Sequence, residues 1–105
     1  MEYFDEDDIN ELKKIINKNI LLKFYADWCK NCDLVNDNII EYIKNNNCKC
    51  ICINIDNNTS ICEYYNIEKL PTIILNEDEK IFGVSAINER LKKKNIDNII
   101  ISEDF

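Results

Sequence analysis

At 105 residues, with 46% hydrophobic and 31% charged residues, the chain has the size and composition of one globular domain, and we expect a single domain over residues 1–105. The net charge of −7 argues against a nucleic-acid partner, because phosphate binding needs a basic face, and the absence of histidine removes the commonest metal ligand. No apolar run approaches the roughly 20 residues that span a bilayer, and the start "MEYFDEDDIN" does not resemble a secretion signal, so we expect a cytoplasmic protein without a membrane partner.

The first half of the chain alternates helix and strand signals. Residues 5–19 have apolar side chains at helical spacing, with acids at the start and lysines at the end, which predicts a helix. The run "ILLKFYA" at residues 20–26 predicts a buried strand. Residues 31–45 carry another apolar stripe at helical spacing, so a second helix is expected there, opened by a CxxC motif that follows a tryptophan.

The second half predicts three more strands and two helical segments. Residues 48–56 are a strongly β-type run, and residues 58–67 predict a short helix or helical turn. Residues 71–75 and 80–85 predict two strands joined by the charged turn "NEDE", and residues 86–95 predict a helix. The tail, residues 96–105, fits either a last helical turn or an edge strand. This order predicts an α/β fold with a central mixed sheet of four to five strands and helices on both faces.

The CxxC motif formed by Cys29 and Cys32 has the spacing of a redox couple. A thiolate is the nucleophile in disulfide exchange, and a helix N-terminus beside Lys30 stabilises a thiolate on Cys29. Cys32, one turn further on, is then close enough to attack a mixed disulfide. From the motif alone, a buried cysteine pair and half of a zinc site remain open alternatives.

Three stretches in order, "FYADWCKNC", "INID" and "YYNIEKLPT", resemble the thioredoxin family. That family carries an aromatic-Ala-x-Trp-Cys-x-x-Cys stretch, a strand that ends in aspartate, and a cis-proline loop. The resemblance runs from about residue 20 to residue 83, and residues 56–72 follow the family pattern without a gap. It implies the thioredoxin fold and the activity of a thiol–disulfide oxidoreductase.

The resemblance also implies roles for individual residues. Cys29 corresponds to the exposed attacking cysteine and Cys32 to the resolving cysteine. Pro71 corresponds to the cis-proline beside the active site, Leu70 to the residue whose backbone aligns the substrate peptide, and Trp28 to the aromatic cover. Pro71 is also the chain's one proline and stands between a helix and a strand, a place compatible with a cis peptide. An ordinary turn proline and an ordinary core tryptophan are the alternatives.

Three residues near the motif depart from the family pattern and are expected to tune the site. Lys30 and Asn31 stand between the cysteines where thioredoxins have Gly-Pro, and Lys23 stands where the family has a buried aspartate that accepts a proton from the resolving cysteine. A charged lysine cannot accept that proton, whereas a lysine left neutral by burial can, and the alternative is that Lys23 extends to solvent. Because cations stabilise the reduced form, we expect a reduction potential of about −250 to −200 mV, above that of thioredoxin.

The remaining cysteines are expected to be core residues. Cys48, Cys50 and Cys52 alternate along one strand and share one face, with neighbours about 6.6 Å apart, too far to clamp a metal by themselves. A disulfide between residues i and i+2 of a strand is poorly directed. Cys62 is expected to be a small apolar residue on the short helix, with regulatory oxidation as the minor alternative.

The sequence therefore predicts an enzyme that exchanges disulfides with protein substrates and is reset by a thioredoxin-reductase-like or other redox partner. We expect a monomer with no cofactor and no metal. Two other functions stay open: a thioredoxin-fold binding module with little reductase activity, and a metal-binding protein that uses the CxxC together with another chain.

Overall fold

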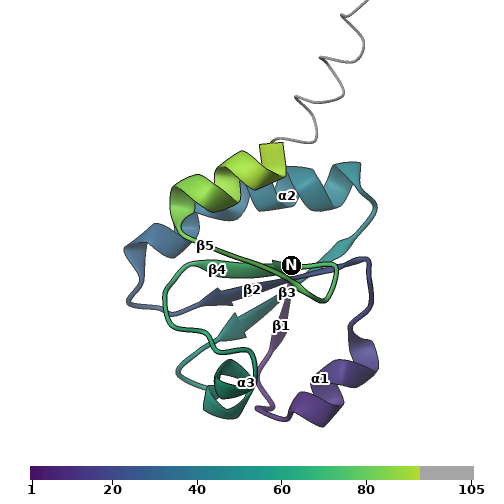
Figure 1. Ribbon diagram of the computed structural model, residues 1–105, viewed down its shortest axis with the longest axis vertical. Helices are drawn as coiled ribbons and strands as arrows, with labels where there is room; N and C mark the ends of the chain where they lie inside the picture. Colours follow the sequence, from purple (N-terminus) through teal and green to yellow (C-terminus); the bar gives the residue numbers. More distant parts are fainter. Residues whose placement is uncertain (93–105) are drawn as a thin grey trace, which may run out of the picture.

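The computed structural model describes residues 1–92, which form a five-stranded sheet with helices on both faces (Figure 1). The elements in chain order are β1 (Glu2–Phe4), α1 (Ile9–Ile15), β2 (Ile20–Tyr25), the 3₁₀ helix η1 (Lys30–Val35), α2 (Asn36–Asn45), β3 (Lys49–Asn54), α3 (Thr59–Tyr64), β4 (Thr72–Leu75) and β5 (Glu79–Phe82). A further helix begins at residue 84 and continues to residue 92. The tail at residues 96–105 and the last part of the helix predicted for residues 86–95 lie outside the described residues.

The sheet is mixed, as predicted, with the strand order β1-β3-β2-β4-β5. β1 and β2 both pair with β3 in parallel, β4 is antiparallel to β2, and β5 is antiparallel to β4. Parallel strands joined by a crossover helix start at the same end of the sheet. The segments that follow β2 and β3 therefore leave the sheet at the same edge, and this edge carries the CxxC motif.

The N-terminal segment differs from its prediction, because residues 5–8 and 16–19 of the predicted helix are loops and an unpredicted strand, β1, precedes them. β1 forms an edge strand on β3, with Tyr3 paired to Cys52. The helix begins only at Ile9, since the Asp8 carboxylate accepts hydrogen bonds from the backbone N–H groups of Asn10 and Glu11 at 2.9 and 3.3 Å. An edge strand of three residues depends on pairing with a distant segment, so local periodicity does not reveal it.

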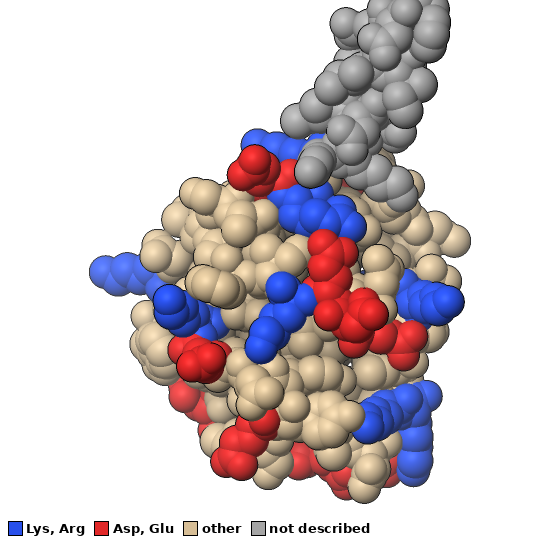
Figure 2. Space-filling view, viewed as in Figure 1, with Lys and Arg blue, Asp and Glu red and all other residues tan. Residues whose placement is uncertain are grey.

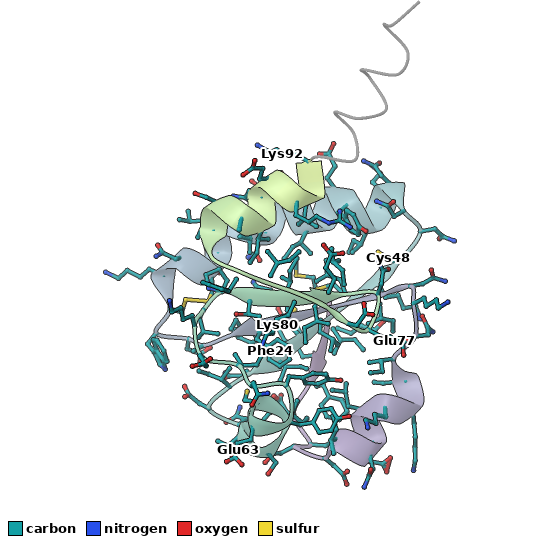
Figure 3. All side chains as sticks on the ribbon, viewed as in Figure 1. Phe24, Cys48, Glu63, Glu77, Lys80 and Lys92 are labelled. Carbon is teal, nitrogen blue, oxygen red and sulfur yellow. A yellow bond between two sulfur atoms is a disulfide. The ribbon has the colours of Figure 1, made fainter. Side chains whose placement is uncertain are left out.

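Two apolar layers pack on the two faces of the sheet. The layer beneath α1 and α3 contains Leu22 and Phe24 of β2, together with Leu12 and Ile61 of these helices. The layer beneath α2 and the helix at residues 84–92 contains Leu21 of β2 and residues of both helices, among them Val35, Ile39, Ile87 and Leu91. Phe24 lies on the α1 and α3 side of the sheet in Figure 3. β2 is buried on both faces, which explains its nearly continuous apolar sequence.

Buried polar contacts fix the loop after β3, close to the CxxC edge. The fully buried Asn58 donates from Nδ2 to the carbonyl oxygens of Phe4 and Asn54, at 3.1 and 2.9 Å, and its Oδ1 accepts from the N–H of Asp7 at 2.9 Å. The Asp7 carboxylate in turn accepts from the N–H groups of Ser60 and Ile61 at the start of α3. These bonds connect the N-terminal loop to residues 54–61, and they fix the position of the segment that follows β3.

Candidate active site

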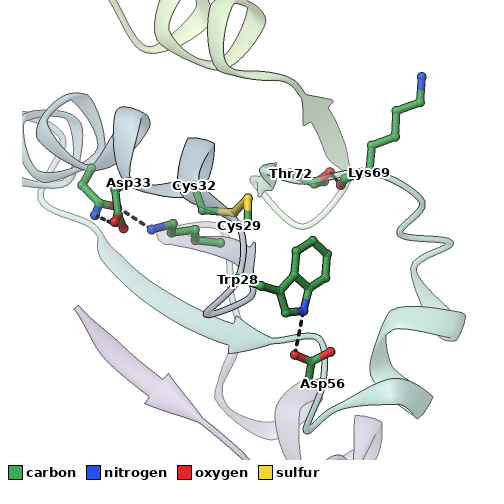
Figure 4. The surroundings of a disulfide bond; sticks show 9 residues. Trp28, Cys29, Cys32, Asp33, Asp56, Lys69 and Thr72 are labelled. Carbon is green, nitrogen blue, oxygen red and sulfur yellow. Dashed lines mark hydrogen bonds between the residues drawn. A yellow bond between two sulfur atoms is a disulfide. The ribbon is translucent and has the colours of Figure 1, made fainter.

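Cys29 and Cys32 lie at the end of the central strand β2 and form a disulfide, with their Cα atoms 5.5 Å apart (Figure 4). The two sulfurs differ in access, because Cys29 is half-buried and Cys32 is only 1% exposed. Cys29 is the N-cap residue of η1 and has extended backbone angles. A reagent in solution therefore meets Cys29 before Cys32.

The helix that opens at the motif is not the continuous α-helix that the sequence predicts. Residues 30–35 form the 3₁₀ helix η1, in which the N–H of Cys32 donates to the Cys29 carbonyl at 3.3 Å, and the α-helix begins only at Asn36. 3₁₀ turns are frequent at the N-termini of α-helices, and hydrophobic spacing does not distinguish them from the α-helix over so few residues. Cys29 still precedes a run of N–H groups, although a 3₁₀ turn gives them poorer hydrogen-bond geometry.

Trp28 stands at the surface beside the disulfide, with 66% of its area exposed, so it is not a core residue. Its indole Nε1 donates a hydrogen bond of 3.0 Å to the Asp56 carboxylate, which follows β3 (Figure 4). The sequence shows Asp56 only as part of a family pattern and does not reveal this contact. The sheet topology is the feature that could have indicated this contact, because the residues that follow the parallel neighbours β2 and β3 lie at the same edge of the sheet.

The Leu70–Pro71 peptide bond is cis, as the resemblance implied, and Pro71 is fully buried. The loop before it forms one wall of a groove of about 490 Å³. The opposite wall comes from the CxxC segment, and the residues that line the groove are Trp28, Cys29, Lys30, Asn31, Ile55, Ile67, Glu68, Lys69 and Leu70. The structure thus brings Trp28, Leu70 and the half-buried Cys29 to one groove, whereas the buried Pro71 is not part of its lining.

The charges near the groove are mixed in sign. Lys30, Asn31, Glu68 and Lys69 are all exposed, and within residues 1–92 no ion pair involves Lys30 or Lys69. Figure 2 shows acidic and basic side chains interspersed on one face of the molecule. A larger hollow of about 640 Å³ lies beside the start of β2, where the Glu79–Arg90 ion pair and Cys48 line it, and the disulfide is not part of its lining.

Lys23 does not reach solvent, which excludes the alternative of an exposed ammonium group. Only 5% of its surface is exposed, and its Nζ donates a hydrogen bond to Oδ1 of Asn36, the first residue of α2. The Asn36 amide donates in turn to the Asp33 carboxylate at 3.4 Å. Asn36 is a second residue that sequence reasoning missed, because nothing in the local pattern connects β2 to this turn of helix.

The remaining cysteines lie outside the disulfide; Cys50 and Cys52 are buried in the core, as predicted, whereas Cys48 and Cys62 are only partly buried. Cys50 and Cys52 are 1% and 2% exposed, and their Sγ atoms lie 4.0 Å apart in a hydrogen bond, closer than the spacing of about 6.6 Å expected along this face, because the side chains turn toward each other. Cys62 is half-buried on α3, and burial together with Asp7 raises the pKa of its thiol to about 11. Within residues 1–92 no group of three or more histidine, cysteine or acidic side chains is placed to hold a metal ion.

Three features define a thioredoxin-fold protein with a redox-type CxxC site. They are the disulfide pair after the central strand, the cis-proline loop across the groove and the order of the strands. The sequence profile of the thioredoxin family matches residues 4–102. The chain belongs to the thioredoxin family.

Individual relatives agree with this assignment. The chain is 29% identical to thioredoxin from Chlorobaculum thiosulfatiphilum over 105 residues, which cover 94% of this chain and 97% of that one. It is 30% identical to thioredoxin from Mycoplasma genitalium over 73 residues, or 67% of this chain and 72% of that one.

Solved structures show the same fold at lower identity. Mitochondrial thioredoxin 3 from Saccharomyces cerevisiae, in its oxidised form, superposes with a TM-score of 0.71 at 19% identity, covering 89% of this chain and 94% of that one. Oxidised thioredoxin from Plasmodium falciparum gives a TM-score of 0.68 at 22% identity, covering 90% and 97%.

Family membership and the Cys29–Cys32 pair at disulfide distance make the chain a thiol–disulfide oxidoreductase, and the binding-only and metal-binding alternatives are not favoured. Membership also implies protein disulfides as substrates and a redox partner. None of the helices described in residues 1–92 has the length and apolar character needed to cross a bilayer.

Proposed function

We propose that Cys29 is the attacking nucleophile and Cys32 the resolving thiol of a dithiol that reduces protein disulfides. The observation that carries this assignment is the difference in access, since Cys29 is half-buried at the mouth of the groove and Cys32 is 1% exposed behind it. An incoming disulfide can meet the first sulfur but not the second.

The reaction proceeds in two exchanges. The Cys29 thiolate attacks one sulfur of the substrate disulfide, the substrate S–S bond breaks, and the departing thiolate takes a proton from water. Cys32 then loses its proton and attacks the Cys29 sulfur, which releases the second substrate thiol and leaves the Cys29–Cys32 disulfide. Two electrons pass to the substrate, and a dithiol donor must return two electrons to the enzyme.

The groove supplies the substrate contacts in this proposal. Leu70, next to the buried Pro71, offers backbone groups to an extended substrate segment, and Trp28 covers the other side of Cys29. The hydrogen bond to Asp56 fixes the orientation of the Trp28 ring. Three residues tune the site, Lys30 and Asn31 through their positions between the cysteines and Lys23 through its buried amine, which is hydrogen-bonded to Asn36 after η1.

We further infer a cytoplasmic monomer that is reset by a thioredoxin-reductase-like partner. Four cysteines are not joined in disulfides, which fits a reducing compartment, namely Cys48, Cys50, Cys52 and Cys62. One solved structure at a TM-score of 0.71 and 20% identity, covering 89% of this chain, comes from work on thiol resolution in a yeast mitochondrial 1-Cys peroxiredoxin by glutathione/thioredoxin systems. A comparable thiol-based partner is the class of protein we expect here.

Replacing the resolving thiol, Cys32→Ser, is expected to trap substrates as mixed disulfides on Cys29. The trapped species accumulates because the second exchange has lost its nucleophile, whereas the first exchange is unaffected. Peptide mapping of the complex formed with oxidised insulin measures which cysteine is linked. The matched control is the double variant Cys29→Ser, Cys32→Ser, which should trap nothing.

If the single variant is linked through Cys48, Cys50, Cys52 or Cys62, the assignment of Cys29 as the nucleophile is wrong. The same holds if the double variant traps as much insulin as Cys32→Ser does.

A further inference from the structure

Lys23 and Cys52 lie side by side in the interior of the molecule. They are paired residues on the neighbouring parallel strands β2 and β3, so their side chains leave the sheet on the same face. The row continues to Tyr3 of β1 on one side and to Ile73 of β4 on the other. Lys23 is 5% exposed and Cys52 is 2% exposed, so an ammonium group and a thiol occupy one row of a buried face.

The charge of Lys23 has no carboxylate partner within residues 1–92. The ion pairs in this part of the chain are Lys14–Glu11 and Arg90–Glu79, and neither contains Lys23. Its Nζ donates to the neutral Asn36 amide oxygen and lies 5.6 Å from the centre of the Tyr25 ring. A buried charge is costly unless an opposite charge compensates it, so a counter-charge is expected close to this row.

Cys52 is the group placed to supply that charge. Its Sγ lies 4.0 Å from the Cys50 Sγ, and the Cys50 thiol can donate a hydrogen bond to it. Cys50 is paired with apolar Leu21, whereas Cys52 is paired with Lys23, so the two thiols have unlike neighbours. The pKa of Cys52 is lowered to about 7 by the hydrogen bond from Cys50 and by the charge of Lys23, although burial acts in the opposite direction. The pKa of Cys50 is raised by the same hydrogen bond and by burial.

The other titratable groups around the row do not offer a better counter-charge. Tyr3 and the amino terminus approach from β1, and Tyr25 lies on β2 with a pKa that burial raises. Asp33 of η1 reaches Lys23 only through the Asn36 amide. The neighbours from β4 and the helix at residues 84–92 are apolar, namely Ile73, Leu75, Ile87 and Leu91.

We propose that Cys52 and Lys23 form a buried thiolate–ammonium pair beneath the CxxC helix, with the Cys50 thiol and the Asn36 amide oxygen as its hydrogen-bond donor and acceptor. The proton that leaves the Cys52 sulfur goes to water, and the resulting thiolate neutralises the ammonium charge of Lys23, so the pair has no net charge. Cys52 and Asn36 then act as positioning residues. They hold Lys23 in place and shield the active-site sulfurs from its charge.

The pair is tested by ultraviolet absorbance of the thiolate near 240 nm in the oxidised protein, in which Cys29 and Cys32 cannot titrate. The wild type should gain one thiolate in a transition centred near pH 7, well below the ordinary range of thiols. Cys52→Ala should abolish the transition, and Lys23→Met should move it upward by at least about one pH unit. The controls Cys48→Ala and Cys62→Ala should leave it unchanged.

No thiolate below about pH 8 in the wild type, or a transition that survives Cys52→Ala, would overturn the pair. Wild type and Cys52→Ala decide this even if Lys23→Met fails to fold. Equilibrium unfolding in urea is a second test. Lys23→Met combined with Cys52→Ala should lower the midpoint by less than the sum of the single variants, because each single change leaves one member unpaired, and strict additivity would contradict the pairing.

The shielding role rests on the proposed function of the CxxC and has its own measurement. Cys52→Ala removes the negative member of the pair, so the Cys29–Cys32 couple should become more oxidising in glutathione buffers, and adding Lys23→Met should reverse the change. An unchanged equilibrium in Cys52→Ala would overturn the shielding role. That result differs from a failure of the proposed function, in which the wild type itself would show no disulfide exchange.

Discussion

Replacing Cys29 by serine is expected to reduce the rate of insulin reduction to that of the uncatalysed reaction. A serine hydroxyl stays protonated at neutral pH and cannot form a disulfide, so the first exchange has no nucleophile. Cys32 cannot take over, because it is 1% exposed behind Cys29. The measurement is the rate of insulin reduction with dithiothreitol as the electron donor.

Cys62→Ser is the matched control for this change. Cys62 is also a half-buried cysteine, but its pKa is raised to about 11 by burial and nearby Asp7, so it is a poor nucleophile at neutral pH. The control should retain nearly all of the activity. If Cys29→Ser keeps more than about a tenth of the wild-type rate, another thiol of the chain must carry the first exchange.

Truncating Phe24 to alanine is expected to lower the free energy of unfolding by about 3–5 kcal/mol. Phe24 is fully buried on the central strand β2, and its ring centre lies 5.8 Å from that of Tyr65. It also packs with residues of α1 and α3, so the cavity would open between the sheet and both helices. Urea unfolding of the oxidised protein, followed by far-ultraviolet circular dichroism, measures the change.

Phe82→Ala is the matched control, because it makes the same phenylalanine-to-alanine change at an exposed position. Phe82 belongs to the edge strand β5 and is 54% exposed, with Lys69 Nζ 5.0 Å from its ring centre. Its loss should cost no more than about 1 kcal/mol. Similar losses in the two variants would contradict the packing described for the centre of the sheet.

Much of the fold could be predicted because its strongest signals are local. β2 is nearly continuously apolar, which favours a buried strand, and the stretch "TIIL" after the proline marks β4. The CxxC motif and the cis-proline loop could also be recognised in the sequence, because their residue types and their order are specific to one family. The sequence therefore predicted the mixed sheet, the CxxC pair and the cis-proline loop.

The parts that the sequence did not reveal depend on partners far apart in the chain. β1 exists because Tyr3 and its neighbours pair with β3, about fifty residues away. The contacts between Trp28 and Asp56 and between Lys23 and Asn36 join different elements, and neither has a local pattern. Alternation placed Cys50 and Cys52 on one face correctly, but only the register with β2 shows that Lys23 is the neighbour of Cys52.

The central claim is that Cys29 and Cys32 are one two-electron redox couple, and equilibration of the wild type with glutathione buffers tests it most directly. Acid quenching, alkylation and mass spectrometry give the fraction of protein that carries the Cys29–Cys32 disulfide at each ratio of reduced to oxidised glutathione. The account predicts one two-electron transition with a midpoint of about −250 to −200 mV, above the value of about −270 mV for thioredoxin because Lys30 lies beside the thiolate. A contrary result would be the absence of a Cys29–Cys32 disulfide at every ratio, with oxidation falling instead on Cys48, Cys50, Cys52 or Cys62.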